Sequence, residues 1–116
     1  MNLFEALLIG HLVGDFLLQT GWMAREKTKS YPALVAHAAV YTATVTAASL
    51  LVGRISWADI ALLFVTHTIL DRRTFVHWWG RRVQSITRPA DQWLYLVTDQ
   101  VFHMLVLVAV VFLAGV

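Results

Sequence analysis

Histidine and aspartate side chains recur in this sequence at a spacing that could bind a metal ion. Three pairs lie four residues apart: His11 with Asp15, His67 with Asp71, and Asp99 with His103. Residues with this spacing project from one face of a helix, so both members of a pair can approach the same ion. The pattern predicts helical elements that carry metal ligands on their inner faces.

A fourth histidine and the absence of cysteine narrow this chemistry further. His37 is followed one helical turn later by Tyr41, and the chain contains no cysteine, so thiolate ligands and disulfides are excluded. Imidazole and carboxylate ligands suit zinc, our first choice, with manganese or iron as alternatives. The seven candidate ligands are His11, Asp15, His37, His67, Asp71, Asp99 and His103.

The charge of the three aspartates also favours a metal. Each carboxylate costs about 2.5 to 3.5 kcal/mol in the middle of an apolar span, so positive charge must compensate it. Two divalent ions would balance three carboxylates and leave about one charge for a hydroxide or a substrate oxygen. Protonated histidines could also supply the charge, in which case the cluster would be a polar core without metal.

Other polar residues beside the pairs could support the site or bind substrate. Gln19, Tyr41 and Gln100 are placed to hold the ligands through hydrogen bonds. Arg72 and Arg73 follow Asp71 and could bind an anionic headgroup, although they could equally anchor the chain at a membrane surface. The sequence alone assigns no catalytic residue.

The composition indicates which elements position these residues. Apolar residues make up 59% of the 116 residues and charged residues 14%. In soluble domains the apolar fraction is nearer one half and the charged fraction nearer one quarter. A span of about 20 apolar residues crosses a hydrocarbon core of about 30 Å. We therefore expect one all-α domain, residues 1–116, that is a four-helix transmembrane bundle. The expected spans are residues 3–23, 32–53, 57–73 and 90–115.

The distribution of basic residues predicts an orientation for this bundle. Lysines and arginines concentrate in the first and third connections, so these should face the cytoplasm and both termini the opposite side. Residues 74–88 alternate arginines with aromatic residues, which indicates an amphipathic segment lying among lipid headgroups. The expected location is a membrane, with the bilayer and its anionic headgroups as partners and no nucleic acid.

The orientation also predicts a depth for the site. In an alternating bundle the three aspartates should lie toward the cytoplasmic side, with the histidine of each pair about one turn deeper. His37 follows Pro32 closely on a helix that starts from that side, so it should lie near the level of the aspartates.

These motifs resemble a known family. The run HLVGDFLLQ from His11 to Gln19, the Lys27-Thr28 pair, His37, the His67 and Asp71 pair, and the Asp99-Gln100-x-x-His103 motif are similar to those of small bacterial inner-membrane proteins classed as a domain of unknown function. The resemblance covers nearly the whole chain. It implies the membrane fold, a location in a bacterial inner membrane and the importance of these positions, but no activity.

A more distant likeness concerns only the pattern of ligands. Zinc-dependent phospholipases C and membrane-bound metal-dependent hydrolases are similar in placing His-x-x-x-Asp or His-x-x-x-Glu pairs around clustered metal ions. The likeness carries over to His11, Asp15, His67 and Asp71, while Asp99 and His103 match in reverse order. No glutamate occurs at this spacing here.

Three functions are consistent with the sequence. The first is a metal-dependent hydrolase of a phosphoester or other lipid-linked substrate at the cytoplasmic membrane face. The second is a transporter or sensor of metal ions or protons, which would favour a homo-oligomer because four helices form a narrow pathway. The third is a membrane partner subunit without catalysis, whose polar core fixes the register of its helices.

Overall fold

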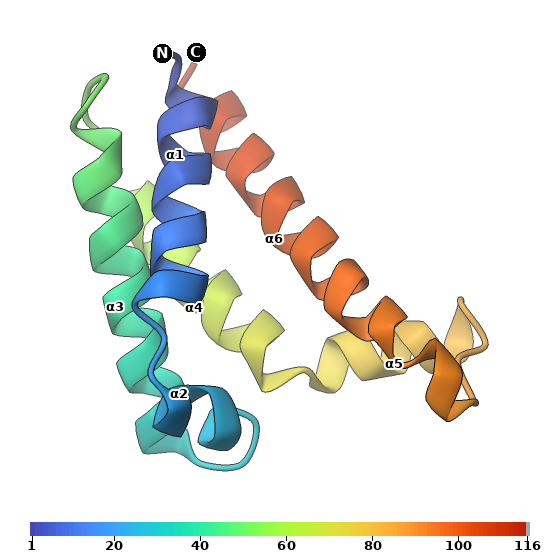
Figure 1. The fold of residues 1–116 in the computed structure, drawn as a ribbon. Helices are drawn as coiled ribbons and strands as arrows, with labels where there is room; N and C mark the ends of the chain where they lie inside the picture. Colours follow the sequence, from blue (N-terminus) through green and yellow to red (C-terminus); the bar gives the residue numbers. More distant parts are fainter. Residues whose placement is uncertain (116) are drawn as a thin grey trace.

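The computed structural model describes residues 1–115 and is helical throughout its regular elements, as the sequence predicts (Figure 1). Along the chain these elements are α1 (Leu3–Leu12), a π-helical turn η1 (Val13–Leu17), α2 (Gly21–Glu26), α3 (Tyr31–Ser49), α4 (Trp57–Arg72), α5 (Thr74–Arg82), a 3-10 turn η2 (Pro89–Asp91) and α6 (Trp93–Leu113).

Local sequence signals fix where the helices begin. The side chain of Asn2 accepts a hydrogen bond from the backbone of Glu5, whose carboxylate returns one to the backbone of Asn2. Ser56 and Asp59 form the same reciprocal cap at the start of α4. Each cap satisfies two backbone N–H groups that a helix start otherwise leaves free. These two helices therefore start at defined residues.

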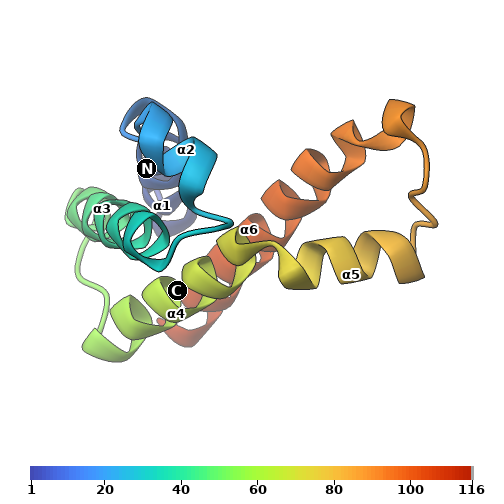
Figure 2. The same cartoon turned by 90° about the horizontal axis from the view of Figure 1, so that it is seen from below.

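Four helices form the body of the molecule. α1 packs against α3, α3 against α4, and α4 against α6, which also contacts α1. Both termini and the turn between α3 and α4 lie at one end, while α2 and α5 lie at the opposite end (Figure 1). Seen from below, α4 and α6 diverge toward the end where α5 joins them (Figure 2).

The expected four membrane spans are only partly present. Within residues 1–115 one helix, Pro89–Leu113 including its first turns, is long and apolar enough to cross a membrane. The span expected at 3–23 is interrupted, because α1 ends at Leu12 and runs through η1 into the separate short helix α2. α3 stops at Ser49, short of residue 53, and α4 has 16 residues.

The third connection also differs from the expected amphipathic segment at 74–88. Helix α5 covers Thr74–Arg82 only, and the chain then turns through Ser85, which has a positive φ of 54°. α5 is amphipathic, with Val76 and Gly80 buried and Trp78 exposed. The amphipathic character predicted for this segment is therefore present over its first half.

Two apolar clusters flank the polar residues. One, toward the termini, joins all four long helices through Leu3, Leu7, Tyr41, Val45, Leu63, Leu107 and Val110. The other, beside α5, consists of Leu70, Val76, Ile86 and Tyr95. The seven candidate ligands lie further along these elements, on the α2 and α5 side of the first cluster. Apolar packing therefore holds the helices whose inner faces carry the polar side chains.

Glycine allows α1 to approach α3 closely. A Cβ atom added at Gly10 would lie 2.8 Å from the Cα atom of Val45 and 2.9 Å from the Cβ atom of Ala48. Gly14 faces Tyr41 in the same way, with 3.2 Å to its Cα atom. The small residues at positions 10 and 14 thus set the spacing of these two helices.

We expect Gly10→Val to destabilise the protein by about 1 to 3 kcal/mol or more, because the backbone of α3 cannot move aside without disturbing the bundle. Thermal unfolding in detergent measures this loss. Gly53→Val is the matched control, since a Cβ atom at Gly53 meets nothing within 4 Å. Equal melting temperatures for the two variants would contradict the close packing of α1 and α3.

Candidate metal centre

Four side chains from three elements converge at the centre of the bundle. Asp15 of η1, His37 of α3, and His67 and Asp71 of α4 are all buried, and each offers one ligand atom within 4.8 Å of the others. Nε2 of His37 lies 2.9 Å from Oδ1 of Asp15 and 2.9 Å from Oδ2 of Asp71. Nε2 of His67 lies 3.0 Å from Oδ2 of Asp71. These four atoms are close enough to hold one metal ion.

The spacing of these atoms suits a four-coordinate ion. Zinc ligands at bonds of about 2.0 to 2.2 Å in a tetrahedron lie roughly 3.3 to 3.6 Å from one another. The four nitrogen–oxygen separations within the group run from 2.9 Å to 3.7 Å, the longest between Nε2 of His67 and Oδ1 of Asp15. Small side-chain adjustments would therefore be enough to complete the coordination.

A second group shares one residue with the first. Asp71, Asp99 and His103, all buried, also offer ligand atoms within 4.8 Å of one another. Nε2 of His103 lies 3.2 Å from Oδ1 of Asp71, the oxygen that is not used by the first group. Asp71 can therefore bridge two cation positions, and six of the seven candidate ligands belong to one group or the other.

Hydrogen bonds join the histidines of α4 and α6, and they define one arrangement of protons for neutral rings. Nδ1 of His103 donates to the backbone carbonyl of Asp99 at 2.7 Å, because a carbonyl only accepts. When both rings are neutral, Nε2 of His103 then accepts from Nδ1 of His67, 3.1 Å away. Nε2 of His67 is left with a bare lone pair that faces carboxylate oxygens. This is the arrangement of a metal-binding imidazole whose other nitrogen is held by a hydrogen bond.

Several buried polar atoms of the site have no hydrogen-bond partner among residues 1–115. They are Nδ1 of His37, Nε2 of His67, Oδ1 of Asp71 and Oδ1 of Asp99. Buried polar atoms are usually paired, so such a concentration requires an explanation. For the three acceptors, a bound cation would provide the missing partner.

His11 occupies a different place from the other predicted ligands. Its Nε2 donates to the amide oxygen of Gln100 at 2.8 Å, and Nδ1 accepts from the hydroxyl of Tyr41 at 2.8 Å. Both ring nitrogens are thus engaged, and His11 is in neither group of ligand atoms found within residues 1–115. Its predicted role as a ligand remains a prediction, and the observed contacts are those of a supporting residue.

The π-helical turn explains why His11 and Asp15 separate. The backbone N–H of Leu18 bonds to the carbonyl of Val13, five residues back, so the helix is wider here than an α-helix. Asp15 is carried round toward His37 on α3, and its Oδ2 atom lies 3.8 Å from Nε2 of His11. Turns of this kind occur often at functional sites, and here the turn brings the carboxylate to the cluster.

Tyr41 and Gln100 support the cluster, as their positions in the sequence predict. The Tyr41 ring stacks on the His67 ring, with centroids 3.8 Å apart and an interplanar angle of 14°. The amide group of Gln100 donates to Oδ2 of Asp15 at 3.4 Å and to Oδ2 of Asp99 at 3.3 Å. Both residues also hold His11, so they connect it to the ligand atoms.

Lys27 is the residue of the site that sequence reasoning missed. It follows α2, is buried, and places Nζ 3.1 Å from Oδ2 of Asp71. The sequence places it with the other basic residues of the first connection, which is expected to face the cytoplasm. Its place in the Lys27-Thr28 pair of the recognised motifs was the one sequence signal that distinguished it. A fixed positive charge therefore belongs to the cluster.

The remaining predicted residues lie at the edge of the site. Nη2 of Arg73 is 4.0 Å from Oδ2 of Asp99, and the guanidinium of Arg72 lies over the ring of Tyr31, 4.6 Å from its centroid. Arg73 also has a positive φ of 66°, an uncommon conformation for a residue other than glycine. The buried Oε1 atom of Gln19 has no hydrogen-bond partner within residues 1–115.

The fifth histidine, His77, lies outside the cluster. It belongs to α5 and packs against Tyr95, with ring centroids 4.5 Å apart. Partial burial and the nearby guanidinium groups of Arg73 and Arg81 hold the pKa of His77 below its ordinary value. His77 is therefore a neutral packing residue at neutral pH, and we assign it no chemistry.

Comparison with known proteins identifies the family of this chain. The model of a family described as a protein of unknown function, DUF3307, matches residues 3–116. The chain belongs to this family. No curated protein and no solved structure matches it. Membership agrees with the resemblance found in the sequence, and the description of the family includes no activity, so the function must be argued from the site.

Proposed function

We propose that this member of the DUF3307 family is an integral membrane protein that binds a divalent metal ion and hydrolyses a lipid-linked phosphoester at the cytoplasmic membrane face. The observation that carries the proposal is the buried Nε2 atom of His67, which lies 3.0 Å from Oδ2 of Asp71 and has no hydrogen-bond partner within residues 1–115. In the neutral ring with its proton on Nδ1, both atoms are acceptors, and a cation between them would remove their repulsion.

The charge of the site supports one divalent ion rather than two. Asp15, Asp71 and Asp99 contribute three negative charges, and Lys27 supplies one positive charge inside the cluster. A single divalent ion then makes the site neutral. We place this ion among Asp15, His37, His67 and Asp71, and zinc fits their nitrogen and oxygen atoms.

The shape and surface of the molecule support a membrane location. Its longest dimension is 44 Å, about the thickness of a bilayer with its headgroups. Large apolar side chains point outward along the helices, among them Val65, Ile69, Val101, Leu105 and Val108. A water-soluble protein rarely exposes so many neighbouring apolar side chains. A hydrocarbon environment is the natural surrounding for them.

The two ends of the bundle differ in charge as the positive-inside rule requires. Arg25, Lys29, Arg81, Arg82 and Arg88 all belong to the end formed by α2, α5 and the loop after α5. The turn between α3 and α4 at the opposite end carries Arg54 alone. This difference favours a cytoplasmic location for the α2 and α5 end. The aspartates of the site lie on that side of the apolar core.

The proposed reaction is the attack of water on phosphorus. A metal ion held by Asp15, His37, His67 and Asp71 would supply a more acidic water and would stabilise negative charge on the phosphoryl group. Oδ1 of Asp99 is unpartnered beside the cluster and can accept the proton of the water. The oxygen–phosphorus bond forms, the ester bond to the lipid alcohol breaks, and this alcohol receives the proton. Arg73, whose buried Nε atom has no partner among residues 1–115, can bind the phosphoryl oxygens.

Removal of metal tests the proposal directly. The purified protein should contain about one equivalent of transition metal and should hydrolyse a phospholipid in vesicles of a bacterial lipid extract. Chelation should abolish the hydrolysis, and added zinc or manganese should restore it. Elemental analysis measures the metal, and mass spectrometry of the lipids identifies the substrate that is lost and the product that is gained.

The other functions give different results in the same vesicles. A transporter would move the metal across the bilayer without consuming lipid, which a metal-sensitive dye inside the vesicles detects. A partner subunit with a purely polar core would keep its fold without metal and show neither activity. Either result, in place of metal-dependent loss of a phospholipid, would contradict the hydrolase proposal.

A further inference from the structure

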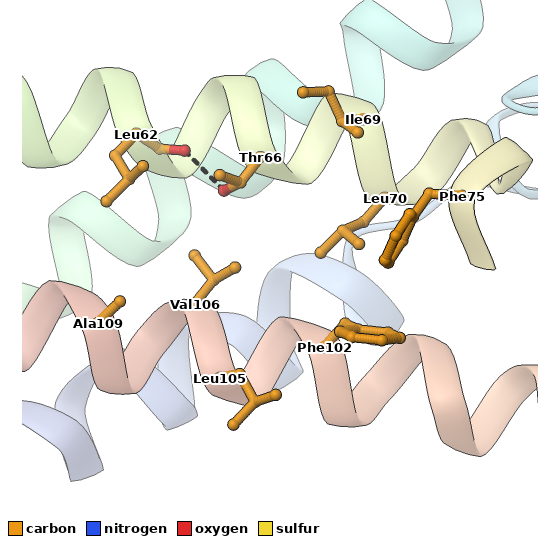
Figure 3. Close-up of a pocket in the computed structure, with 9 residues that line it drawn as sticks. All are labelled: Leu62, Thr66, Ile69, Leu70, Phe75, Phe102, Leu105, Val106 and Ala109. Carbon is orange, nitrogen blue, oxygen red and sulfur yellow. Dashed lines mark hydrogen bonds between the residues drawn. The ribbon is translucent and has the colours of Figure 1, made fainter. Parts of the chain in front are cut away.

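An apolar groove runs between α4 and α6 on the outside of the bundle (Figure 3). Its volume is about 430 Å³, within the range of ligand pockets. Leu70 and Phe75 face Phe102 and Val106 across it, and Ala109 lies at its other end. It extends from Leu62 to Leu70 on α4, about 12 Å at the rise of a helix.

The lining of the groove offers no free polar group. Thr66 is its single polar residue, and the hydroxyl of Thr66 donates to the carbonyl of Leu62 at 2.6 Å (Figure 3). A peptide or a sugar would lose its hydrogen bonds with water here without replacement. Hydrocarbon is the chemistry that such a lining accepts.

The groove is separated from the candidate metal centre by one layer of side chains. Thr66, Leu70 and Val106 line the groove on one side and a small inner space on the other. His67 and His103 border that inner space. On its outer side the groove opens past Ile69 and Leu105, which are 55% and 56% exposed. It therefore lies between the surface of the bundle and the side chains that would carry the chemistry.

We propose that the groove between α4 and α6 holds one hydrocarbon chain of the lipid substrate, so that the phosphoester reaches the metal centre from the side of the bilayer. This inference rests on the proposed function and specifies its substrate as a lipid whose own chain is recognised. The size of the groove favours a chain over a helix of a second copy. A helix of the same length, about 10 to 12 Å wide, has roughly two to three times the volume of the groove.

Photo-crosslinking tests the groove without relying on catalysis. Vesicles of phosphatidylcholine would contain phosphatidic acid with a diazirine in one acyl chain, and mass spectrometry would locate the adducts. We expect adducts at the groove residues of α4 and α6. Ala109→Phe fills the groove and should reduce them about tenfold, the equivalent of 1.4 kcal/mol of lost chain contact. Ala109→Leu is a smaller blocking variant if the phenyl ring disturbs the helix pair.

Ala39→Phe is the matched control, because Ala39 is also an exposed helical alanine and lies on α3, away from this groove. It should leave the labelling of the residues that line the groove unchanged. Labelling spread evenly over the apolar surface, or unaffected by either blocking variant, would overturn the inference. So would a dimer, crosslinked through α4 and α6, that Ala109→Phe dissociates.

Different results would contradict the proposed lipid site in the groove and the proposed hydrolase activity. Specific labelling of the groove without metal-dependent hydrolysis would retain the lipid site and reject the hydrolase. Hydrolysis that depends on metal, without groove labelling, would retain the hydrolase and reject the chain site. Metal content measured in each variant confirms that the cluster itself is intact.

Discussion

The Asp71→Asn variant is expected to lose divalent-metal affinity by more than about 100-fold, since even residues outside the coordination sphere cost roughly 10- to 100-fold when replaced. Asp71 is the one residue shared by both groups of ligand atoms. Its Oδ2 atom contacts Lys27, His37 and His67, and its Oδ1 atom contacts His103. Asparagine keeps the size of the side chain but removes its charge. Titration of the metal-free protein with zinc measures the change.

Asp59→Asn is the matched control, because it shows whether the loss of metal affinity is specific to Asp71 or follows from replacing any buried aspartate of α4. Asp59 is also buried on α4, but it lies in the first turn and caps the helix with Ser56. Asp59→Asn should therefore bind metal as the wild type does, with a cost in stability of about 1 kcal/mol from the weakened cap. Wild-type zinc affinity in Asp71→Asn would rule out the proposed metal centre.

The spacing of residues predicted most of the site, because an α-helix fixes which side chains share a face. His67 and Asp71 meet at 3.0 Å, and Asp99 and His103 belong to one group. His37 reaches Asp15 and Asp71, as expected from its position soon after the start of its helix. In each case, regular helical geometry carries the prediction from the sequence to the structure.

Helical spacing predicts less where the backbone departs from that geometry. His11 and Asp15 have the same spacing as the other pairs, but the π-helical turn at Val13–Leu17 rotates Asp15 away from His11. Nothing in the types of these residues distinguishes a π turn from an α turn. The interruption at Leu18–Thr20 was missed for the same reason. An average of hydropathy over residues 3–23 is insensitive to a change in direction of the chain.

Lys27 was missed because its role depends on a contact between residues 44 positions apart. A lysine in a polar connection is usually at the surface, and its neighbours Arg25 and Lys29 are indeed exposed. The short helix α2 folds back against α3 and turns this one side chain inward. Only the three-dimensional path of the connection determines which of its basic residues contributes to the site.

Replacement of Lys27 is the second change with a large expected effect. The variant should lose stability, and bound zinc should restore it. Lys27→Met should destabilise the metal-free protein by about 3 to 5 kcal/mol, the usual cost of removing one partner of a buried ion pair. Methionine has a similar length and leaves the carboxylate of Asp71 without its cation. Thermal unfolding in detergent, with and without zinc, measures the loss and its recovery.

Lys29→Met is the matched control for this measurement. Lys29 is exposed two residues further along the same connection, so its replacement should change neither the melting temperature nor the effect of zinc. If both variants unfolded as the wild type does, the contact between Lys27 and Asp71 would contribute nothing to the site.

The number of bound ions in Lys27→Met tests the charge argument itself. With Lys27 present, one divalent ion neutralises the three aspartates. Without it, the cluster carries an additional uncompensated negative charge, and the group of Asp71, Asp99 and His103 offers a second position. We therefore expect the zinc content to rise from about one equivalent toward two at saturating zinc. A content that stays at one would mean that ligand geometry, rather than charge, limits the site to a single ion.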